Sequence, residues 1–218
     1  MKEEKYKSTT SIKPRLIVAV LVAAALWFLM FSPWVHLDLN FWWMMTGSAV
    51  ILISMAMAFG KDWRTAFRIE NPVGQILLGI TIAAVLWGVF WVGDKLSQMM
   101  FGFARPQVDS IYGMKAGLPS WLIALFLLFV IGPAEELFWR GYVQRTLAQW
   151  KTPVWGFVAG TLVYALIHIW ALNFMLLMAA LVCGVVWGAL YWWKPKWLPA
   201  LVLSHALWDA FVFVILPI

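Results

Sequence analysis

Residues 132–141 read Gly132-Pro133-Ala134-Glu135-Glu136-Leu137-Phe138-Trp139-Arg140-Gly141. Two adjacent carboxylates and an arginine stand here at the end of a run of 19 uncharged residues, Ala116 to Ala134. A charged group at membrane depth costs about 2.5–3.5 kcal/mol even on the mildest scales, so such groups are rare and are functional by default. The stretch therefore predicts a transmembrane helix that carries a functional site, around which the remaining helices pack.

The composition is that of a polytopic membrane protein. Hydrophobic residues make up 64% of the chain and charged residues only 12%, and the charges form short clusters between long apolar runs. The net charge of +6 does not form a basic stripe, because the lysines and arginines fall in the connections between apolar runs. This pattern excludes nucleic acid as a partner and makes the lipid bilayer the surroundings of the chain. Cys183 lies inside an apolar run, which excludes a disulfide framework and a cysteine-based metal site.

The apolar runs predict an all-α transmembrane bundle of about seven helices, because each run is long enough for a spanning helix of roughly 20 residues. The predicted spans are 16–37, 39–60 and 71–93, then Gly117 to about Arg140, two spans between Lys151 and Lys194 that turn at residues 171–173, and one from Leu198 onward. The chain divides into a cytoplasmic tail, three N-terminal spans with an external loop, and a catalytic core of four spans, which are residues 1–15, 16–115 and 116–218.

The distribution of positive charge predicts the orientation. With the N-terminus in the cytoplasm, the inside segments hold thirteen lysines and arginines, Arg140 among them, and the outside segments hold three. This excess predicts a cytoplasmic N-terminus and an external C-terminus, and the short chain with compact loops favours a bacterial cell membrane. The outside connection from Asp94 to Lys115 mixes aromatic and charged residues, so it is either an amphipathic interfacial segment or a plain loop.

Few polar groups remain at membrane depth once the connections are set aside. They are Glu135, Glu136 and Arg140 on the fourth helix, His168 on the fifth, and His205 and Asp209 on the seventh. Glu136 and Arg140 are four residues apart and share a helix face, whereas Glu135 points about 100° away. Tyr164 and His168 repeat this spacing, as do His205 and Asp209. The pattern predicts one polar pocket between helices four, five and seven.

Each of these motifs alone also fits a structural role, such as an ion pair at a helix end or a satisfied core histidine. In hydrocarbon a buried polar group must find partners, which favours convergence. The depths do not match at once: at 1.5 Å per residue, His205 lies about 11 Å and His168 about 20 Å or more from the cytoplasmic ends. Tilted helices, a late start of helix five after Pro153, or a fourth helix that continues past Arg140 each close this gap.

Three ordered motifs carry a family resemblance. They are Glu135-Glu136-x-x-x-Arg140 followed by Gly141, then Tyr164-x-x-x-His168, and then His205-x-x-x-Asp209. In this order on hydrophobic helices they resemble the CPBP family of intramembrane endopeptidases, which includes the CAAX prenyl proteases and the bacterial Abi proteins linked to bacteriocin processing and self-immunity. The similarity covers roughly residues 116–216. Two positions depart from the family pattern, since Tyr164 stands where Phe is usual and Asp209 where Asn is frequent.

The resemblance implies a glutamate-type hydrolysis of peptide bonds. It implies that Glu135 and His168 activate a water molecule and that His205 donates a ring N–H to the oxyanion. An ionised Asp209 only accepts hydrogen bonds, so it is either protonated or orients His205 through the other ring nitrogen, and we favour the second. Glu136 and Arg140 then form a supporting pair, or Arg140 meets a substrate carboxylate, and Tyr164 adds a hydroxyl near His168. The expected substrate is a peptide or a membrane-anchored protein.

Three alternatives remain open at this stage. No cofactor is expected, but zinc is a competing possibility, with Glu135, Glu136, His168 and His205 as its ligands and an open position for water. The chain lacks the His-Glu-x-x-His pattern of many zinc proteases, which argues against this choice. A non-catalytic immunity or scaffold protein of the same fold would keep these residues for structure, and a proton-coupled transporter would use them as a relay.

Overall fold

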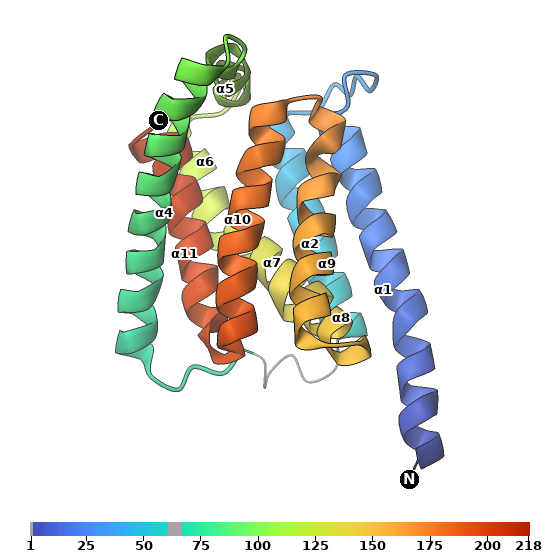
Figure 1. Cartoon of the computed structure of the whole chain (residues 1–218). Coiled ribbons are helices and arrows are strands. Elements are labelled where there is room, and N and C mark those ends of the chain that lie inside the picture. Colours follow the sequence, from blue (N-terminus) through green and yellow to red (C-terminus); the bar gives the residue numbers. More distant parts are fainter. Residues whose placement is uncertain (1, 61–66) are drawn as a thin grey trace.

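The computed structural model describes residues 2–60 and 67–218, with side chains described from Pro14 onward. Lys61 and Arg64 of the predicted inside connection lie outside this part. The described residues form helices and no strands, and seven helices are long and apolar enough to cross a membrane. These are Pro14–Phe31, Phe41–Phe59, Pro72–Met100, Ser120–Trp150, Pro153–Ala171, Phe174–Trp193 and Pro195–Ile215. The chain is an integral, multi-pass, all-α membrane protein, as the apolar runs predict (Figure 1).

The helices follow one another closely along the chain. Their bounds are α1 (Lys2–Phe31), α2 (Phe41–Phe59), α4 (Pro72–Met100), α5 (Ala104–Gly113), α6 (Ser120–Phe126), η1 (Leu127–Ile131), α7 (Gly132–Glu136), η2 (Leu137–Gln144), α8 (Arg145–Trp150), α9 (Pro153–Leu166), η3 (Ile167–Ala171), α10 (Phe174–Trp193), η4 (Pro195–Trp197), α11 (Leu198–Ala210) and η5 (Phe211–Ile215). Side-chain caps begin four of them, because an Asn or Thr oxygen accepts a hydrogen bond from an unpaired N–H of the first turn. The capping residues are Asn40, Asn71, Thr152 and Asn173.

The fourth span is a composite helix. It runs through α6, η1, α7, η2 and α8, and η1 and η2 are wider π-helical turns on either side of α7. Pro133 lacks the N–H that an α-helix would use to bond the carbonyl four residues earlier, so the regular ladder is interrupted at this point. Such π turns occur frequently at functional sites. Here they rotate the two glutamates of α7 relative to the helix before and after them.

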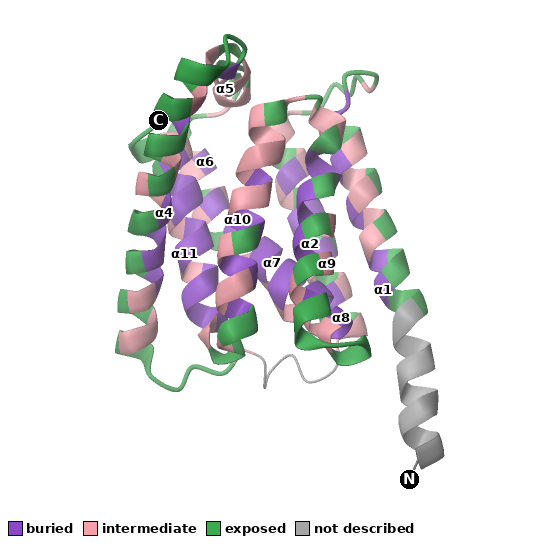
Figure 2. Ribbon diagram, in the orientation of Figure 1, coloured by how far each residue is buried: buried purple, intermediate pink, exposed green. Residues whose placement is uncertain are grey.

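Helix α11 is the central helix of the bundle. Two thirds of its span is buried, more than in any other span, and Figure 2 shows the buried residues concentrated on α11 and α7. Helices α4 and α7 pack against it. Gly132 makes the α7 contact possible, because a Cβ atom there would lie only 2.7 Å from the Cα atom of Ala206. The backbones of α7 and α11 therefore approach as closely as small residues allow.

Three boundaries differ from the sequence prediction. The fourth span continues to Trp150, so Arg140 lies inside a helix and does not belong to the inside connection in which it was counted. Helix α4 continues past Asp94 to Met100, because the charge of Asp94 is paired with Lys95. The connection predicted to lie outside contains the helix α5, so it is not a plain loop. The segment assigned to a tail continues α1 from Lys2, and the two termini lie at opposite ends of the bundle (Figure 1).

Candidate active site

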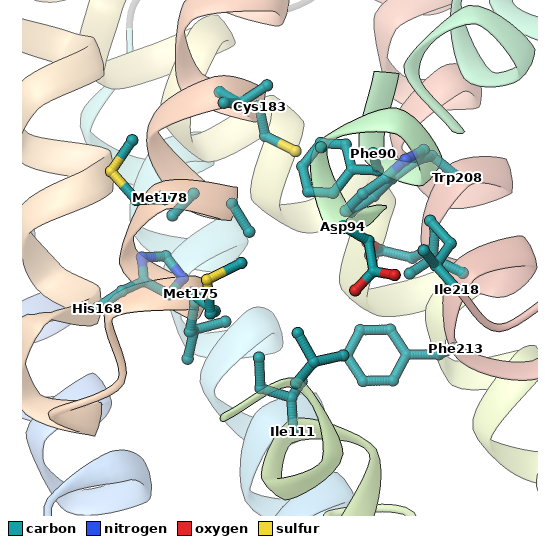
Figure 3. Close-up of a pocket in the computed structure, with 18 of the residues that line it drawn as sticks. Phe90, Asp94, Ile111, His168, Met175, Met178, Cys183, Trp208, Phe213 and Ile218 are labelled. Carbon is teal, nitrogen blue, oxygen red and sulfur yellow. The ribbon is translucent and has the colours of Figure 1, made fainter. Parts of the chain in front are cut away.

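The bundle encloses a cavity of about 620 Å³ with mostly apolar walls. Its walls include residues of α4, α5 and α10 as well as polar residues of the three motifs. Those on its wall are Glu135, Tyr164, His168, His205 and Asp209, from α7, α9, η3 and α11. Spans four, five and seven therefore bring these side chains to one cavity. Figure 3 shows the cavity with His168 on one side and Asp94 on the other.

The two adjacent glutamates have different surroundings. Glu135 lines the cavity and is 5% exposed, and among the described residues no group forms a hydrogen bond with its carboxylate. Glu136 is fully buried and lies behind the cavity wall. The angular separation of neighbouring residues on a helix accounts for this difference. Glu135 is thus the carboxylate that can meet a ligand, and Glu136 is the one that can hold the structure.

Glu136 is the centre of a buried ionic cluster. Arg140 Nη1 donates to Glu136 Oε2 at 3.1 Å, and His205 Nδ1 lies 3.0 Å from the same oxygen. Arg140 is 2% exposed and does not line the cavity, and its guanidinium lies over the ring of Tyr164 at 4.6 Å. The i, i+4 spacing that predicts the Glu136–Arg140 pair is confirmed by this contact. In this position Arg140 supports the cluster and does not face a substrate.

His205 lies between two carboxylates. Its Nδ1 is next to Glu136, and its Nε2 is 3.5 Å from Asp209 Oδ2. The ring also stacks on the indole of Trp187, with centroids 4.0 Å apart. The sequence favours Asp209 as the residue that orients His205, but in the structure Glu136 accepts the hydrogen bond of the ring, because α7 and α11 pack directly on each other. Asp209 is close but lies beyond an ordinary hydrogen-bond length.

Both ring nitrogens of His168 have partners. Nδ1 lies 2.9 Å from the carbonyl oxygen of Tyr164, and Trp27 Nε1 donates to Nε2 at 3.1 Å. Since the indole can only donate, Nε2 is the acceptor and Nδ1 carries the proton. No hydrogen bond joins His168 to Glu135 among the described residues, although both line the cavity. The two side chains therefore have separate partners, and their predicted action on a shared water molecule stays a prediction.

The sixth span and the first span supply groups that the motifs do not contain. Arg140 Nη2 points to the carbonyl oxygens of Cys183 and Gly184 on α10, at 3.5 and 3.4 Å. Trp187 of α10 stacks on His205 and donates to Ser204 at 3.1 Å, and α1 contributes Trp27. A sequence does not show which backbone carbonyls accept hydrogen bonds from side chains. The spacing of Gly184 and Gly188, four residues apart, does indicate close packing between helices.

His168 and His205 line the same cavity, although their depths along the helices differ when they are counted from the sequence. One of the three possibilities raised from the sequence is found, because α8 extends the fourth span past Arg140 to Trp150. A late start of the fifth span is not found, since α9 begins at Pro153, where the Thr152 cap starts the helix. The fifth span ends in the tighter turn η3, which carries His168.

The side chains do not fit the predicted zinc site. Within the part of the chain that the structure describes, no three His, Cys, Asp or Glu side chains are arranged to hold a metal ion. Glu136 already binds Arg140 and His205, and each ring nitrogen of His168 already has a hydrogen-bond partner. A zinc ion would need these groups as ligands at about 2.0–2.2 Å. The arrangement of these side chains therefore does not support the zinc alternative.

The outer part of the cavity is closed by α5. The Tyr112 hydroxyl donates to the carbonyl of Val212 at 3.1 Å and accepts from the backbone N–H of Ile218 at 2.9 Å. Burial raises the pKa of Tyr112, so the phenol keeps its proton and remains a donor at neutral pH. These bonds attach α5 to the end of the seventh span, next to the cavity.

The fold and the cavity define a multi-pass membrane protein that holds a cluster of ionisable side chains inside its bundle. Residues 117–211 match a protein family described as type II CAAX prenyl endopeptidase, Rce1-like. This match confirms the resemblance to the CPBP and CAAX protease family that the three motifs predict, and the family is one of proteases. Helices α1, α2, α4 and α5 lie outside the matched segment. Searches among curated proteins and among solved structures returned no match.

Proposed function

We propose that this protein is an intramembrane endopeptidase that hydrolyses peptide bonds of a membrane-associated protein or peptide. The observation that carries the proposal is Glu135, a carboxylate without a hydrogen-bond partner among the described residues, on the wall of an apolar cavity that also holds His205. A general base must reach a water molecule and be free to accept its proton. Glu135 meets both conditions, whereas Glu136 does not.

The proposed reaction begins with a water molecule beside Glu135. The water oxygen attacks the carbonyl carbon of the peptide, and its proton passes to Glu135. In its doubly protonated form, His205 donates from Nδ1 to Glu136. Its Nε2–H, which lies nearest to Asp209 in this structure, donates to the oxyanion when the intermediate forms. Glu135 then passes the proton to the amide nitrogen as the oxyanion collapses and the C–N bond breaks, so that a carboxylic acid and an amine leave the site.

Asp209, Glu136 and Arg140 serve as positioning residues in this proposal. Glu136 fixes His205 through Nδ1, and Arg140 fixes Glu136 from the other side. Asp209 limits the rotation of the ring from the side of Nε2. Because these groups are already oriented before the substrate arrives, no reorganisation is needed as charge develops on the oxyanion.

His168 enters the proposed reaction by an exchange of partners. Its Nε2 accepts from Trp27 in this structure, and we infer that a water molecule replaces the indole when the substrate binds. Tyr164 holds the ring in place through its backbone carbonyl and covers Arg140 with its own ring. The roles inferred for Glu135 and His168 from the resemblance are therefore compatible with a structure whose described residues show no hydrogen bond between these two side chains.

The proposed substrate and orientation follow from the apolar walls and from the charges of the connections. Apolar walls favour a peptide or protein segment that is itself in the membrane. We further propose that the protein lies in a bacterial cell membrane with its N-terminus in the cytoplasm, in line with the excess of lysine and arginine in the inside connections.

Cleavage of a peptide library by the detergent-purified protein tests this function. New peptide termini are identified by mass spectrometry for the unmodified chain, for Glu135→Gln and for the control Glu70→Gln, each with and without a chelator. We expect cleavage that is lost in Glu135→Gln, kept in Glu70→Gln and unchanged by the chelator. Glu70 is a suitable control because it is an exposed carboxylate on the connection before α4. Chelator-sensitive cleavage would contradict the proposed mechanism, and equal cleavage by Glu135→Gln would contradict the role of that residue.

A further inference from the structure

Asp94 is a second carboxylate on the wall of the same cavity. It belongs to α4, outside the segment that matches the protease family, and it is 6% exposed. Its Oδ2 atom accepts from Gln98 Nε2 at 2.6 Å and from Lys95 Nζ at 3.3 Å. Its Oδ1 atom is buried and has no hydrogen-bond partner among the described residues. A buried carboxylate oxygen without a donor is costly, so a ligand that supplies a donor at this point gains free energy.

The other polar side chains near Asp94 do not supply a hydrogen-bond donor to its Oδ1 atom. The Lys95 side chain is 53% exposed and its contact is longer than the 2.7–2.9 Å that is usual for a charge-assisted hydrogen bond, so it compensates the carboxylate weakly. Arg105 is committed elsewhere, since it donates to Asp109 from Nε and Nη2 at 2.9 and 2.6 Å. The Tyr112 hydroxyl is used by Val212 and Ile218. None of these groups reaches Asp94 Oδ1.

The walls next to Asp94 define the rest of the ligand. Figure 3 shows Asp94 and His168 on opposite sides of the cavity, with apolar side chains around them. These include Ile111, Met175, Met178 and Phe213. An apolar space with one acceptor at its edge selects a molecule that has an apolar stem and a terminal hydrogen-bond donor. A carboxylate only accepts, and its strongest partner is a cation with N–H donors.

We propose that Asp94 Oδ1 binds a primary ammonium group of the substrate, carried by a lysine side chain or by a free N-terminus, while the peptide bond lies at Glu135. The assignment rests on the proposed protease function for the position of the peptide bond, but the amine site itself does not depend on catalysis. The contact to Asp94 is the same before and during the reaction. It therefore strengthens substrate binding, and its loss raises KM and leaves kcat unchanged.

The binding test uses fluorescent decapeptides of leucine and alanine and the full chain in detergent. One series is N-acetylated and carries a single lysine at each position in turn, and its matched series carries norleucine, which has a similar stem and no ammonium. A third peptide has no lysine and a free N-terminus. Affinities are measured for Glu135→Gln, which prevents turnover, for Glu135→Gln with Asp94→Asn, and for Glu135→Gln with Asp109→Asn. Asp109 is a matched control because it is an acid on the neighbouring α5 that does not line the cavity.

With Asp94 present, we expect at least one lysine peptide, or the peptide with a free N-terminus, to bind about tenfold or more tightly than its matched partner. We expect the Asp94→Asn protein to lose this preference, because the amide places either a donor or a neutral acceptor where Oδ1 stood. We expect the Asp109→Asn protein to keep the preference. Equal binding of all matched pairs by the protein with Asp94 overturns the proposal, and so does a preference that survives Asp94→Asn. The comparison of lysine with norleucine peptides uses the protein with Asp94 intact, so the test holds even if Asp94→Asn does not fold.

Cleavage of the same peptides separates this inference from the proposed function. An ammonium preference in binding without cleavage by the unmodified chain would reject the protease and support the amine site. Cleavage with the same KM for the unmodified chain and Asp94→Asn would support the protease and reject the amine site. A KM increase of about tenfold for the preferred peptide, at constant kcat, supports both.

Discussion

Replacement of Glu136 by alanine tests the buried ionic cluster by its effect on stability. Glu136 is fully buried and accepts from Arg140 at 3.1 Å and from His205 at 3.0 Å. Without it, Arg140 keeps only two carbonyl acceptors at 3.4 and 3.5 Å, and one of these already accepts from Thr161. Removal of one partner from a buried ion pair costs about 3–5 kcal/mol, because the other charge is left uncompensated.

The assay is thermal unfolding of the detergent-purified variants. For a chain of this length about 1 kcal/mol shifts the midpoint by roughly 2–4 °C, so Glu136→Ala should lower it by about 6–20 °C. The control is Glu70→Ala, since Glu70 forms an exposed pair with Lys196 at 3.9 Å and such pairs contribute about 0–1 kcal/mol. The double variant Glu136→Leu, Arg140→Met removes both charges and should be more stable than Glu136→Ala.

Two results would refute this reasoning. A midpoint for Glu136→Ala within about 2 °C of the unmodified chain would mean that Arg140 is not buried with Glu136 as its counter-charge. A double variant that is no more stable than Glu136→Ala would mean that the two side chains do not act as a pair.

Trp27→Phe removes the N–H donor that occupies His168 Nε2 and keeps an aromatic ring. We expect the rate of cleavage to rise by up to about fivefold, which corresponds to the free energy of one neutral hydrogen bond. A tenfold loss of kcat would show instead that Trp27 has to hold the His168 ring for catalysis. Gly132→Ala should lower the unfolding midpoint because its Cβ atom meets Ala206, whereas Gly88→Ala, where a Cβ atom meets nothing within 4 Å, should leave it equal or higher; the same shift for both variants would argue against the close contact of α7 with α11. Alkaline phosphatase fused to the C-terminus should be active in a bacterial host and green fluorescent protein fused there should be dark, and the reverse result would overturn the proposed orientation.

The sequence predicts the seven spans and the cavity residues well, for a physical reason. Hydrocarbon tolerates few polar side chains, so those that remain have to converge, and i, i+4 spacing shows which of them share a helix face. This reasoning separates Glu135 from Glu136 and pairs Glu136 with Arg140. Both features are found in the structure, where Glu135 lines the cavity and Glu136 binds Arg140.

Other features depend on how the helices are rotated and packed, which a single sequence does not specify. The sequence predicts that the fourth span ends at about Arg140, because a charge usually ends a span, but a buried partner lets the helix continue. Asp94 was placed at the end of a span for the same reason. Trp27 and Trp187 belong to none of the three motifs, and the packing of α1 and α10 brings them to His168 and His205.

The most direct test of the central claim is the turnover of a cleaved peptide by Glu135→Gln. Glutamine keeps the size of the side chain and removes the base, and general base catalysis contributes about 10²–10⁴-fold to the rate. We expect kcat to fall by at least about 10²-fold while peptide binding and the unfolding midpoint stay close to those of the unmodified chain. A Glu135→Gln protein that folds, binds the peptide and cleaves it at the original rate would contradict the assignment of Glu135 as the group that activates water.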